Sequence, residues 1–216
     1  AAIRQSINVN YSCNNGLCGS CKCKLINGNT SCIGPEIGLT DKERADGQIL
    51  SCVRIAESDV SLDVEDFGPV ELPKAKTTPC RIDKIKPLTN NILEVTLRLP
   101  PAKNFCFIPG QYINITGPNG HSRSYSIANA PNKSNFISLH IRAVKHGAMS
   151  DYWFNQAKSN DLLRFNGPLG TFFLRDTFKI DLIFLATGTG IAPVKSIFSN
   201  INASSIPNSK GSFSSG

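Results

Sequence analysis

The sequence contains no long hydrophobic run. Its longest strongly apolar stretch, residues 182–186 (LIFLA), is far shorter than the ~20 residues that a membrane-spanning helix needs, so no membrane partner is expected. The N-terminus lacks the basic start, apolar core and small-residue cleavage site of a secretory signal peptide. It also lacks an initiator methionine, and we therefore expect the chain to begin inside a longer protein.

Eight cysteines occur in this sequence without a secretory signal. Disulfide frameworks belong to oxidising compartments, so a disulfide scaffold is disfavoured. Metal ligands or buried free thiols in a reducing cytoplasm account for such cysteines better. The sequence thus predicts a cytoplasmic protein.

The net charge of +7 is distributed unevenly along the chain. Residues 1–72 contain 6 Lys+Arg and 10 Asp+Glu, whereas residues 73–216 contain 17 and 6. This contrast predicts two domains with different partners. The basic half is either an ordinary solvated surface or a region that attracts anionic ligands such as phosphates. Its basic residues are scattered and no nucleic-acid-binding motif is present, so nucleic acid is not an expected partner.

Two breaks in the pattern divide the chain. Residues 69–79 contain three prolines and little periodicity, which is typical of a linker. The tail from about residue 199 is rich in Ser, Asn and Gly and is predicted to be disordered. The predicted parts are a first domain over 1–70, a linker over 71–79, a second domain over 80–176, and the start of a third domain over 177–216 that ends in the Ser-rich tail.

Alternating apolar and polar residues predict strands in the middle of the chain. The alternation covers residues 91–99 and 136–144, and residues 110–116 form a third short candidate. Several short strands with Pro/Gly turns favour a small antiparallel barrel or sandwich. Residues 149–157 are the one convincing helix of this region.

Residues 179–199 follow a different pattern. A continuous apolar run over 179–186 predicts a buried strand, followed by a glycine turn and a helix over 191–199. This order is typical of the first β-turn-α unit of an α/β nucleotide-binding domain.

Four cysteines have a spacing that suits a metal cluster. Cys13, Cys18 and Cys21 follow the pattern C-x4-C-x2-C of plant-type [2Fe–2S] sites, and Cys52 is the natural distant fourth ligand. Small residues between them allow the backbone to wrap the inorganic sulfides. Zinc fits less well, since the usual twin CxxC pairs are absent; four incidental cysteines are the remaining alternative. The other four, read as ordinary residues, are Cys23, Cys32, Cys80 and Cys106.

This region resembles the cluster-binding part of plant-type ferredoxin domains. The resemblance rests on YSCNNGLCGSCKCK at 11–24 and GQILSCVRIAESDVSLDVE at 47–65. It implies an α+β fold of the β-grasp type with a [2Fe–2S] cluster on Cys13, Cys18, Cys21 and Cys52. Such domains begin with a hairpin well before the first cluster cysteine, and only twelve residues precede Cys13. We therefore expect the β-grasp sheet to be incomplete.

The segment Arg123-Ser124-Tyr125-Ser126 combines a cation for phosphate, a flat aromatic ring and a small hydroxyl. It resembles the RxYS motif of the ferredoxin–NAD(P)H reductase superfamily. The resemblance implies that the arginine pairs with a flavin phosphate, the tyrosine packs on the isoalloxazine, and the final serine lies near flavin N5. Taken alone, such a motif could equally be a strand with alternating surface residues.

Two further segments match the same superfamily in the same order. His140-Ile141-Arg142 puts two polar side chains on one strand face, and Gly147-Ala148-Met149-Ser150 precedes the predicted helix with a capping serine. A helix N-terminus of small residues is a natural anion site, and the resemblance assigns it to a pyrophosphate, which favours FAD over FMN. The residues predicted to hold FAD are Arg123, Ser124, Tyr125, Ser126, His140, Ile141, Arg142, Gly147, Met149 and Ser150.

A glycine turn after the apolar run resembles the start of the NAD(P)-binding domain of this superfamily. Its glycines permit close approach of a pyrophosphate, although the full GxGxxG fingerprint is not present. The preceding segment at 167–173 (GPLGTFF) is also similar to the family. Since the Ser-rich tail replaces the rest of that domain, we expect normal nicotinamide binding to be lost. The residues predicted to bind NADH or NADPH are Thr187, Gly188, Thr189 and Gly190.

The resemblance implies an electron-transfer oxidoreductase, with no residue singled out as catalytic. Electrons pass from NAD(P)H through FAD to the cluster, because a flavin couples a two-electron donor to a one-electron carrier. Within the superfamily the sequence is most similar to the CDP-6-deoxy-3,4-glucoseen reductases, which implies a pyridoxamine-phosphate-dependent dehydratase of CDP-3,6-dideoxysugar biosynthesis as electron acceptor. One alternative is the reductase component of a bacterial multicomponent oxygenase. Another is an inactive, truncated electron-carrier fragment.

Overall fold

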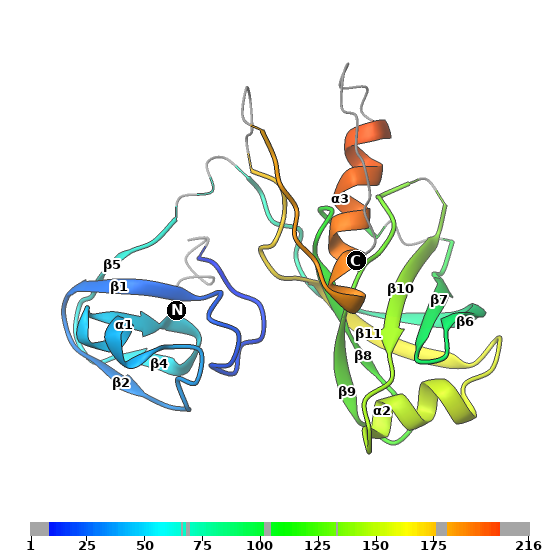
Figure 1. The fold of residues 1–216 in the computed structure, drawn as a ribbon, viewed down its shortest axis with the longest axis horizontal. Helices are drawn as coiled ribbons and strands as arrows, with labels where there is room; N and C mark the ends of the chain where they lie inside the picture. The colour runs from blue at the N-terminus through cyan, green and yellow to red at the C-terminus, as the bar shows by residue number, and fades with distance from the viewer. Residues whose placement is uncertain are drawn as a thin grey trace. The chain divides into compact units, whose positions relative to one another are not determined.

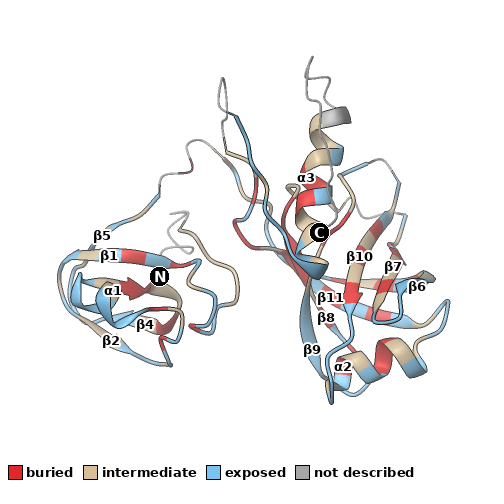
Figure 2. Cartoon of the chain, viewed as in Figure 1, coloured by how far each residue is buried: buried red, intermediate tan, exposed pale blue. Residues whose placement is uncertain are grey.

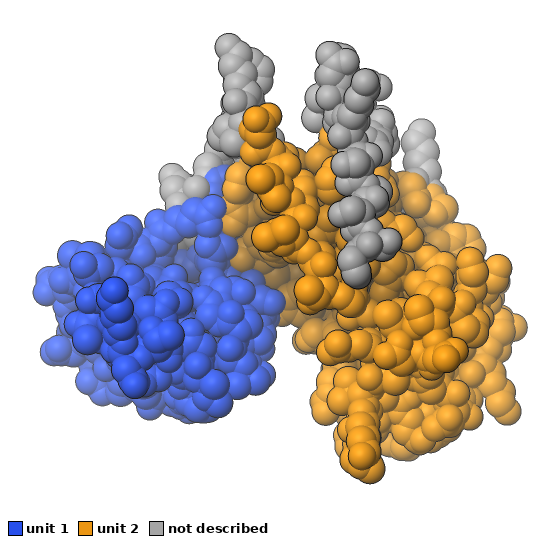
Figure 3. Space-filling view, viewed as in Figure 1, with its two compact units in different colours: residues 1–71 blue, residues 72–216 orange. Residues whose placement is uncertain are grey.

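The computed structural model describes residues 9–65, 67, 70–101, 105–132, 134–175 and 181–203. The chain divides into two compact units, Ala1–Glu71 and Leu72–Gly216 (Figure 3). They are called here the acidic unit and the barrel unit. Within the described ranges, no helix has the length and apolar character needed to cross a membrane.

The acidic unit consists of short antiparallel strands and one short helix (Figure 1). Three strands form a sheet in the order β3-β1-β5, and two more form the pair β2-β4. A capping box starts the helix, since Thr40 and Glu43 each accept a hydrogen bond from the other's backbone N–H. The elements are β1 (Lys22–Asn27), β2 (Thr30–Cys32), α1 (Asp41–Ala45), β3 (Gln48–Leu50), a 3₁₀ turn (Ser51–Val53), β4 (Arg54–Ala56) and β5 (Ser61–Asp63).

The hydrophobic core of the acidic unit is small. Its cluster of buried residues holds Cys21, Leu39, Leu50 and Val53, and α1 buries none of its side chains. A core of this size buries little apolar surface. The loops of this unit must therefore be held by polar contacts as well.

The barrel unit contains a six-stranded antiparallel sheet in the order β10-β7-β6-β11-β8-β9. Its edge strands meet, because Ile127 bridges to Leu139 and the Ala128 N–H donates to Ser138 O at 2.8 Å. Closure removes the free edges of the sheet and makes it a barrel. The strands are β6 (Lys76–Thr89), β7 (Ile92–Arg98), β8 (Tyr112–Thr116), β9 (Ser122–Ser126), β10 (Phe136–Arg142) and β11 (Leu162–Leu169).

The predicted antiparallel barrel is confirmed, and its strands follow the alternation in the sequence. The segments predicted at 91–99, 110–116 and 136–144 correspond to β7, β8 and β10. Figure 2 shows buried residues distributed along these strands. The fully buried side chains that they contribute include Val95, Leu97, Ile113, Ile115, Ile137, Leu139 and Ile141.

β6 begins at Lys76, inside the stretch 71–79 that the sequence indicates as a linker. Pro79 pairs with Arg164 of β11, whereas pairing with β7 starts at Arg81. At Pro79 the strand thus has a neighbour on one side only. A proline whose nitrogen faces away from that neighbour loses no ladder hydrogen bond, so the proline does not end the strand.

The helix predicted over 149–157 is present with a wider turn than expected. α2 (Ala148–Asp151) continues into a π-helical turn over Tyr152–Gln156. The Ala157 N–H closes this turn by donating to Tyr152 O at 2.8 Å. The wider turn brings Tyr152 and Trp153 into the barrel core, where both are buried.

The strand predicted over 179–186 is wrong for the residues that the structure describes. Residues 181–186 form no strand, and Ile183 and Leu185 are 86% and 90% exposed; residues 179 and 180 lie outside the described ranges. An apolar run becomes a buried parallel strand only where other strands pair with it. Among the described residues no strand does so.

The helix predicted over 191–199 is confirmed as α3 (Ile191–Ala203), preceded by a 3₁₀ turn at Gly188–Gly190. α3 packs on the barrel unit, where Ala192, Val194 and Ile197 are buried. The Ser196 hydroxyl donates to Asn129 O at 2.7 Å. The tail beyond residue 203, predicted to be disordered, lies outside the described residues.

Candidate functional site

The loop at 13–21 in the acidic unit winds tightly because three of its residues adopt a left-handed backbone. Their φ values are +54° at Asn14, +76° at Gly16 and +73° at Gly19. A Cβ on Gly16 would lie 1.8 Å from Pro35 O, so only glycine fits there. The Gly38 N–H donates to Gly16 O at 2.8 Å. The segment 33–39 thus supports the cysteine loop from behind.

Replacing Gly16 by alanine is expected to disrupt this loop and lower its iron content. Gly47→Ala is the matched control, since Gly47 has φ of +79° and no atom within 4 Å of a Cβ. Both variants carry the left-handed strain of roughly 1–2 kcal/mol, and only Gly16→Ala adds the backbone clash. Iron per chain after anaerobic reconstitution, with the thermal unfolding midpoint, measures the difference. Equal losses in both variants would contradict the close approach to Pro35.

The four predicted cluster cysteines lie at this loop and at the 3₁₀ turn after β3. The Cys18 N–H donates to Cys13 Sγ at 3.4 Å, and the Cys21 and Cys52 thiols interact directly. Among the described residues, no three His, Cys, Asp or Glu side chains converge closely enough to hold a single metal ion. A [2Fe–2S] cluster asks for a different arrangement, because each of its two irons takes two of the four ligands. Two adjacent thiol pairs fit that arrangement.

The two pairs differ in their electrostatic surroundings. Partial burial acts to raise the pKa of Cys18, but hydrogen bonds from Ser20 and Cys13 outweigh it and bring this pKa to about 7. Burial and the hydrogen bond with Cys52 raise the pKa of Cys21 to about 12. The Ser20 N–H also lies 3.5 Å from Cys18 Sγ. Backbone N–H groups directed at sulfur are the contacts that tune an iron–sulfur centre.

The remaining cysteines have other surroundings. Cys23 on β1 and Cys80 on β6 are buried, and burial raises the pKa of each thiol. Cys32 and Cys106 are exposed.

A buried ion pair joins the two cysteine-bearing segments. The Glu36 side chain is 5% exposed, and its carboxylate accepts two hydrogen bonds from Arg54, at 2.9 Å from Nε and 2.8 Å from Nη2. Its Oε1 also accepts from the Leu50 N–H at 2.9 Å. Glu36 lies in the segment behind the cysteine loop, whereas Leu50 and Arg54 flank Cys52. The pair therefore braces the two groups of predicted ligands against each other.

The Glu36–Arg54 ion pair predicts that the acidic unit loses stability at low pH. The hydrogen bonds from Arg54, against the opposing effect of burial, lower the pKa of Glu36 from 4.5 to about 2. A carboxylate with a lowered folded-state pKa stabilises the fold above its unfolded value, and this contribution is lost as the pH falls from about 4.5 toward 2. Hydrogen exchange of the acidic unit between pH 6 and 3 should show this loss in the wild type and a shallower dependence in Glu36→Gln. Parallel profiles would contradict the assignment.

The predicted flavin motif occupies β9, at one end of the sheet order. Tyr125 lies opposite Ile113 of β8 and packs against the barrel core. Arg123 lies opposite Ile115 but is exposed, and among the described residues its guanidinium makes one hydrogen bond, from Nη1 to Ser122 O at 2.8 Å. Most of its N–H groups thus remain available for a phosphate.

The two serines of the motif alternate with Tyr125 and Arg123 along β9. Ser124 lies opposite Asn114 of β8, and its hydroxyl donates to Asn114 Oδ1 at 2.6 Å. Ser126 lies opposite Tyr112 at the end of the strand and is half-buried. Because successive strand residues point to opposite faces, the serines and the Arg–Tyr pair cannot face the same side of the sheet.

The polar residues of the predicted His140-Ile141-Arg142 segment lie outside the barrel core. Ile141 is buried in that core, so its side chain is not available to a ligand. His140 is 8% exposed at its side chain, and its Nε2 has no hydrogen-bond partner among the described residues. The closest acid, Glu94, is 3.8 Å away, too far for a hydrogen bond. Burial and the nearby Lys195 lower the pKa of His140, so its imidazole is neutral at pH 7.

The structure brings this segment together with the glycine turn that precedes α3. A Cβ on Gly188 would lie 3.7 Å from Arg142 Nη1. The Gly190 N–H donates to Thr187 O at 3.0 Å, which closes the turn, and Gly188 has φ of +53°. Lys195 of α3 contacts Glu94 at 3.5 Å. Three groups therefore lie in this region: His140 Nε2, which has no hydrogen-bond partner among the described residues, Arg142, and the N-terminus of α3. Together they suit a phosphate-bearing ligand.

The predicted site at 147–150 is partly corrected. Gly147 is the N-cap of α2 and makes no side-chain cap, whereas Ser150 lies inside the first turn and accepts from the Val144 N–H at 2.9 Å. Ser150 is therefore not the capping residue, because its hydroxyl fixes the preceding loop instead. Met149 is buried in the barrel core. A surface hollow of about 580 Å³ lies here, lined in part by Gly147, Ser150 and Asp151.

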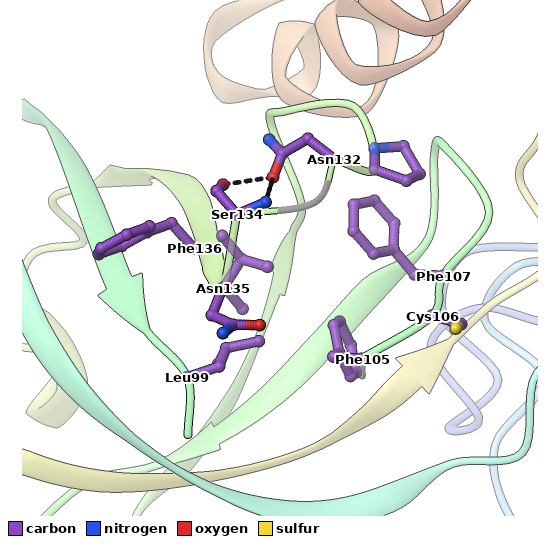
Figure 4. Close-up of a pocket in the computed structure, with 10 residues that line it drawn as sticks. Leu99, Phe105, Cys106, Phe107, Asn132, Ser134, Asn135 and Phe136 are labelled. Atoms are coloured by element: carbon purple, nitrogen blue, oxygen red, sulfur yellow. Dashed lines mark hydrogen bonds between the residues drawn. The ribbon is translucent and has the colours of Figure 1, made fainter. Parts of the chain in front are cut away.

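A separate pocket of about 320 Å³ lies elsewhere on the barrel unit (Figure 4). Phe105, Phe107 and Phe136 contribute to its walls, and Asn132 accepts a hydrogen bond from the Ser134 N–H at 2.9 Å. None of the predicted flavin residues lines it. The presence of a pocket therefore does not by itself locate the flavin site in this unit.

Comparison with known proteins supports both units. Residues 1–57 match the 2Fe-2S iron-sulfur cluster binding domain, and residues 79–174 match the oxidoreductase FAD-binding domain. A [2Fe–2S] domain joined to an FAD-binding barrel defines the iron–sulfur flavoproteins. The chain therefore contains a [2Fe–2S] domain and an FAD-binding domain of the kinds found in ferredoxin–NAD(P) reductases.

Curated relatives and a solved structure share this organisation. The CDP-6-deoxy-L-threo-D-glycero-4-hexulose-3-dehydrase reductase of Yersinia pestis is 44% identical over 197 residues, which cover 91% of this chain and 59% of that protein. The toluate 1,2-dioxygenase electron transfer component of Pseudomonas putida is 33% identical over 205 residues, covering 93% and 60%. The Amycolatopsis cytochrome P450 reductase superposes with a TM-score of 0.72 at 30% identity, covering 94% and 62%. The chain thus spans about three fifths of the length of these proteins.

Proposed function

We propose that this chain transfers electrons from NADH or NADPH through FAD to a [2Fe–2S] cluster and on to a partner enzyme. The flavin, when bound, supplies the coupling between a two-electron donor and a one-electron carrier. The observation that carries the proposal is the presence of both cofactor sites in one chain. Two thiol pairs lie on the acidic unit, and an exposed arginine beside a half-buried tyrosine lies on β9 of the barrel unit.

The predicted site residues other than Ser124 and the core residues Ile141 and Met149 have proposed roles that their surroundings allow. Arg123 binds a flavin phosphate, Tyr125 packs against the isoalloxazine and Ser126 contacts the ring near N5. His140 and Arg142 offer polar groups outside the core, and the N-terminus of α2 at Gly147 and Ser150 takes the pyrophosphate. The thiolates of Cys13 and Cys18 hold one iron, and those of Cys21 and Cys52 the other. The turn proposed to contact the pyridine nucleotide comprises Thr187, Gly188, Thr189 and Gly190.

For the acceptor we propose the pyridoxamine-phosphate-dependent dehydratase of CDP-3,6-dideoxysugar biosynthesis. The support is the degree of similarity, since the Yersinia dehydrase reductase is 44% identical whereas the toluate dioxygenase component is 33% identical. Similar coverage of this chain by both relatives makes the two identities comparable. We also propose a cytoplasmic location, because all eight cysteines are free thiols and the cluster ligands must stay reduced.

An oxygenase is the second candidate acceptor. The toluate 1,2-dioxygenase electron transfer component matches this chain across both units, at 33% identity over 93% of the chain. Internal electron transfer would be the same in both cases. Only the protein that reoxidises the cluster differs.

An anaerobic visible absorption spectrum of the purified chain, before and after NADH, tests the proposal. Overlapping flavin and iron–sulfur bands that bleach with NADH, followed by reoxidation on adding the dehydratase with its substrate, would support the whole relay. Reoxidation by an oxygenase alone would favour the second candidate. Bleaching by dithionite but not by NADH or NADPH would remove the pyridine nucleotide from the scheme. A colourless chain would refute the function and favour the inactive fragment.

A further inference from the structure

The single tryptophan of this chain contacts the flavin motif. Trp153 lies in the π turn after α2, is 2% exposed, and donates a hydrogen bond from Nε1 to the Tyr125 hydroxyl at 2.9 Å. The two rings meet edge to face, with centroids 6.1 Å apart and an interplanar angle of 87°. This geometry is a favoured one for aromatic pairs and fixes the tilt of the Tyr125 ring.

The direction of this hydrogen bond constrains the Tyr125 proton. An indole N–H can only donate, so the Tyr125 oxygen is the acceptor and its own O–H must point elsewhere. Among the described residues this O–H donates to no acceptor. This O–H is therefore available to an acceptor oxygen that a ligand supplies at this position.

We propose that Trp153 is a positioning residue for the flavin site, which orients the Tyr125 hydroxyl so that its proton is donated to a hydroxyl or phosphate oxygen of the bound flavin nucleotide. This inference rests on the proposed function, since it requires a flavin nucleotide beside β9. Burial also raises the pKa of Tyr125, which keeps this hydroxyl protonated and able to donate at neutral pH.

The neighbouring tyrosine provides a contrast within the same turn. Tyr152 is also buried, and its ring lies 5.1 Å from that of Trp153. Its hydroxyl donates to Asp161 Oδ2 at 3.2 Å, so its polar end has an acceptor inside the protein. Of these two adjacent buried aromatic residues, Trp153 donates its hydrogen bond to the flavin motif, whereas Tyr152 donates its hydrogen bond to Asp161.

Binding of FAD to the full chain tests the proposal with four variants: Trp153→Phe, Tyr125→Phe, their combination, and Tyr152→Phe as control. Trp153→Phe keeps an aromatic ring but removes the N–H donor. We expect Trp153→Phe and Tyr125→Phe each to weaken FAD binding about threefold to tenfold, the effect of one hydrogen bond. The double variant should bind no more weakly than Tyr125→Phe alone, because the tryptophan acts through the tyrosine. Tyr152→Phe should lower the thermal midpoint and leave the FAD dissociation constant unchanged.

Three outcomes would overturn the inference. One is a wild-type dissociation constant in Trp153→Phe, and another is additive losses in the double variant. The third is an equal loss in Tyr152→Phe, which would indicate general core damage. A wild-type chain that binds no FAD would refute the flavin site itself, and a wild-type chain that binds FAD with any of the three outcomes refutes only the role of Trp153.

Discussion

Replacing Cys52 by alanine is expected to abolish the [2Fe–2S] cluster and leave the barrel unit folded and able to bind FAD. Cys52 is the one predicted ligand outside the loop at 13–21, and its thiol pairs with that of Cys21. Without it, one iron loses half of its protein ligands. Iron per chain and the iron–sulfur absorption bands should fall to background, while the flavin bands persist.

Cys106→Ala is the matched control for this experiment. Cys106 is exposed and belongs to the barrel unit, outside the cluster pattern. Its replacement should leave both the iron content and the flavin bands unchanged. An unchanged iron content in Cys52→Ala would exclude Cys52 as a ligand, and loss of the flavin bands would show that the effect is not confined to the acidic unit.

Replacing Arg54 by methionine is expected to destabilise the acidic unit by about 3–5 kcal/mol, because the buried Glu36 carboxylate loses its partner. The loss of the brace should also reduce cluster content. Tryptophan fluorescence cannot follow this unit, since Trp153 belongs to the barrel unit. Hydrogen exchange at the Leu50 amide, which donates to Glu36, is the appropriate measurement.

Two further variants separate the buried pair from general charge effects. In Glu36→Met combined with Arg54→Met no charge stays buried, so most of the lost stability should return. Asp41→Asn removes an exposed partner of Arg44 and should change stability by about 1 kcal/mol or less. An Arg54→Met protein as stable as Asp41→Asn would show that the Glu36 contact contributes little.

The barrel could be predicted from the sequence because its physical cause is local. Strands with one buried face alternate with period two, and β7 and β10 carry that alternation over their whole length. The four cysteines of the proposed cluster site could be picked out for a similar reason, since three of them lie within nine residues of chain. The fourth required only a cysteine at a distance. The spacing of residues along the sequence was therefore enough to predict most of the fold and the proposed cluster site.

The contacts that depend on distant residues were not predictable. Glu36 and Arg54 are 18 positions apart, and a single charged residue of each sign has no pattern to reveal the pair. From the sequence alone, Trp153 is expected to be a core residue of a helix. The structure shows that it lies in a π turn and donates a hydrogen bond to Tyr125. The run at 181–186 has the composition of a strand, but composition does not supply the neighbouring strands that it needs. Ser150 looks like an N-cap, but the N-cap of α2 is Gly147, three residues earlier, and Ser150 lies within the helix.

The small core of the acidic unit has a consequence for how that unit folds. Cys21, itself a proposed ligand, is one of the four residues in its buried cluster. Iron bonds from 13–21 to Cys52 would close a long loop and reduce the freedom of the unfolded chain, as a cross-link does. Ligation and folding of this unit would then form one equilibrium, shifted by mass action. In a cell, the folded fraction of the acidic unit would follow the supply of iron, whereas the barrel, with its own core, would not.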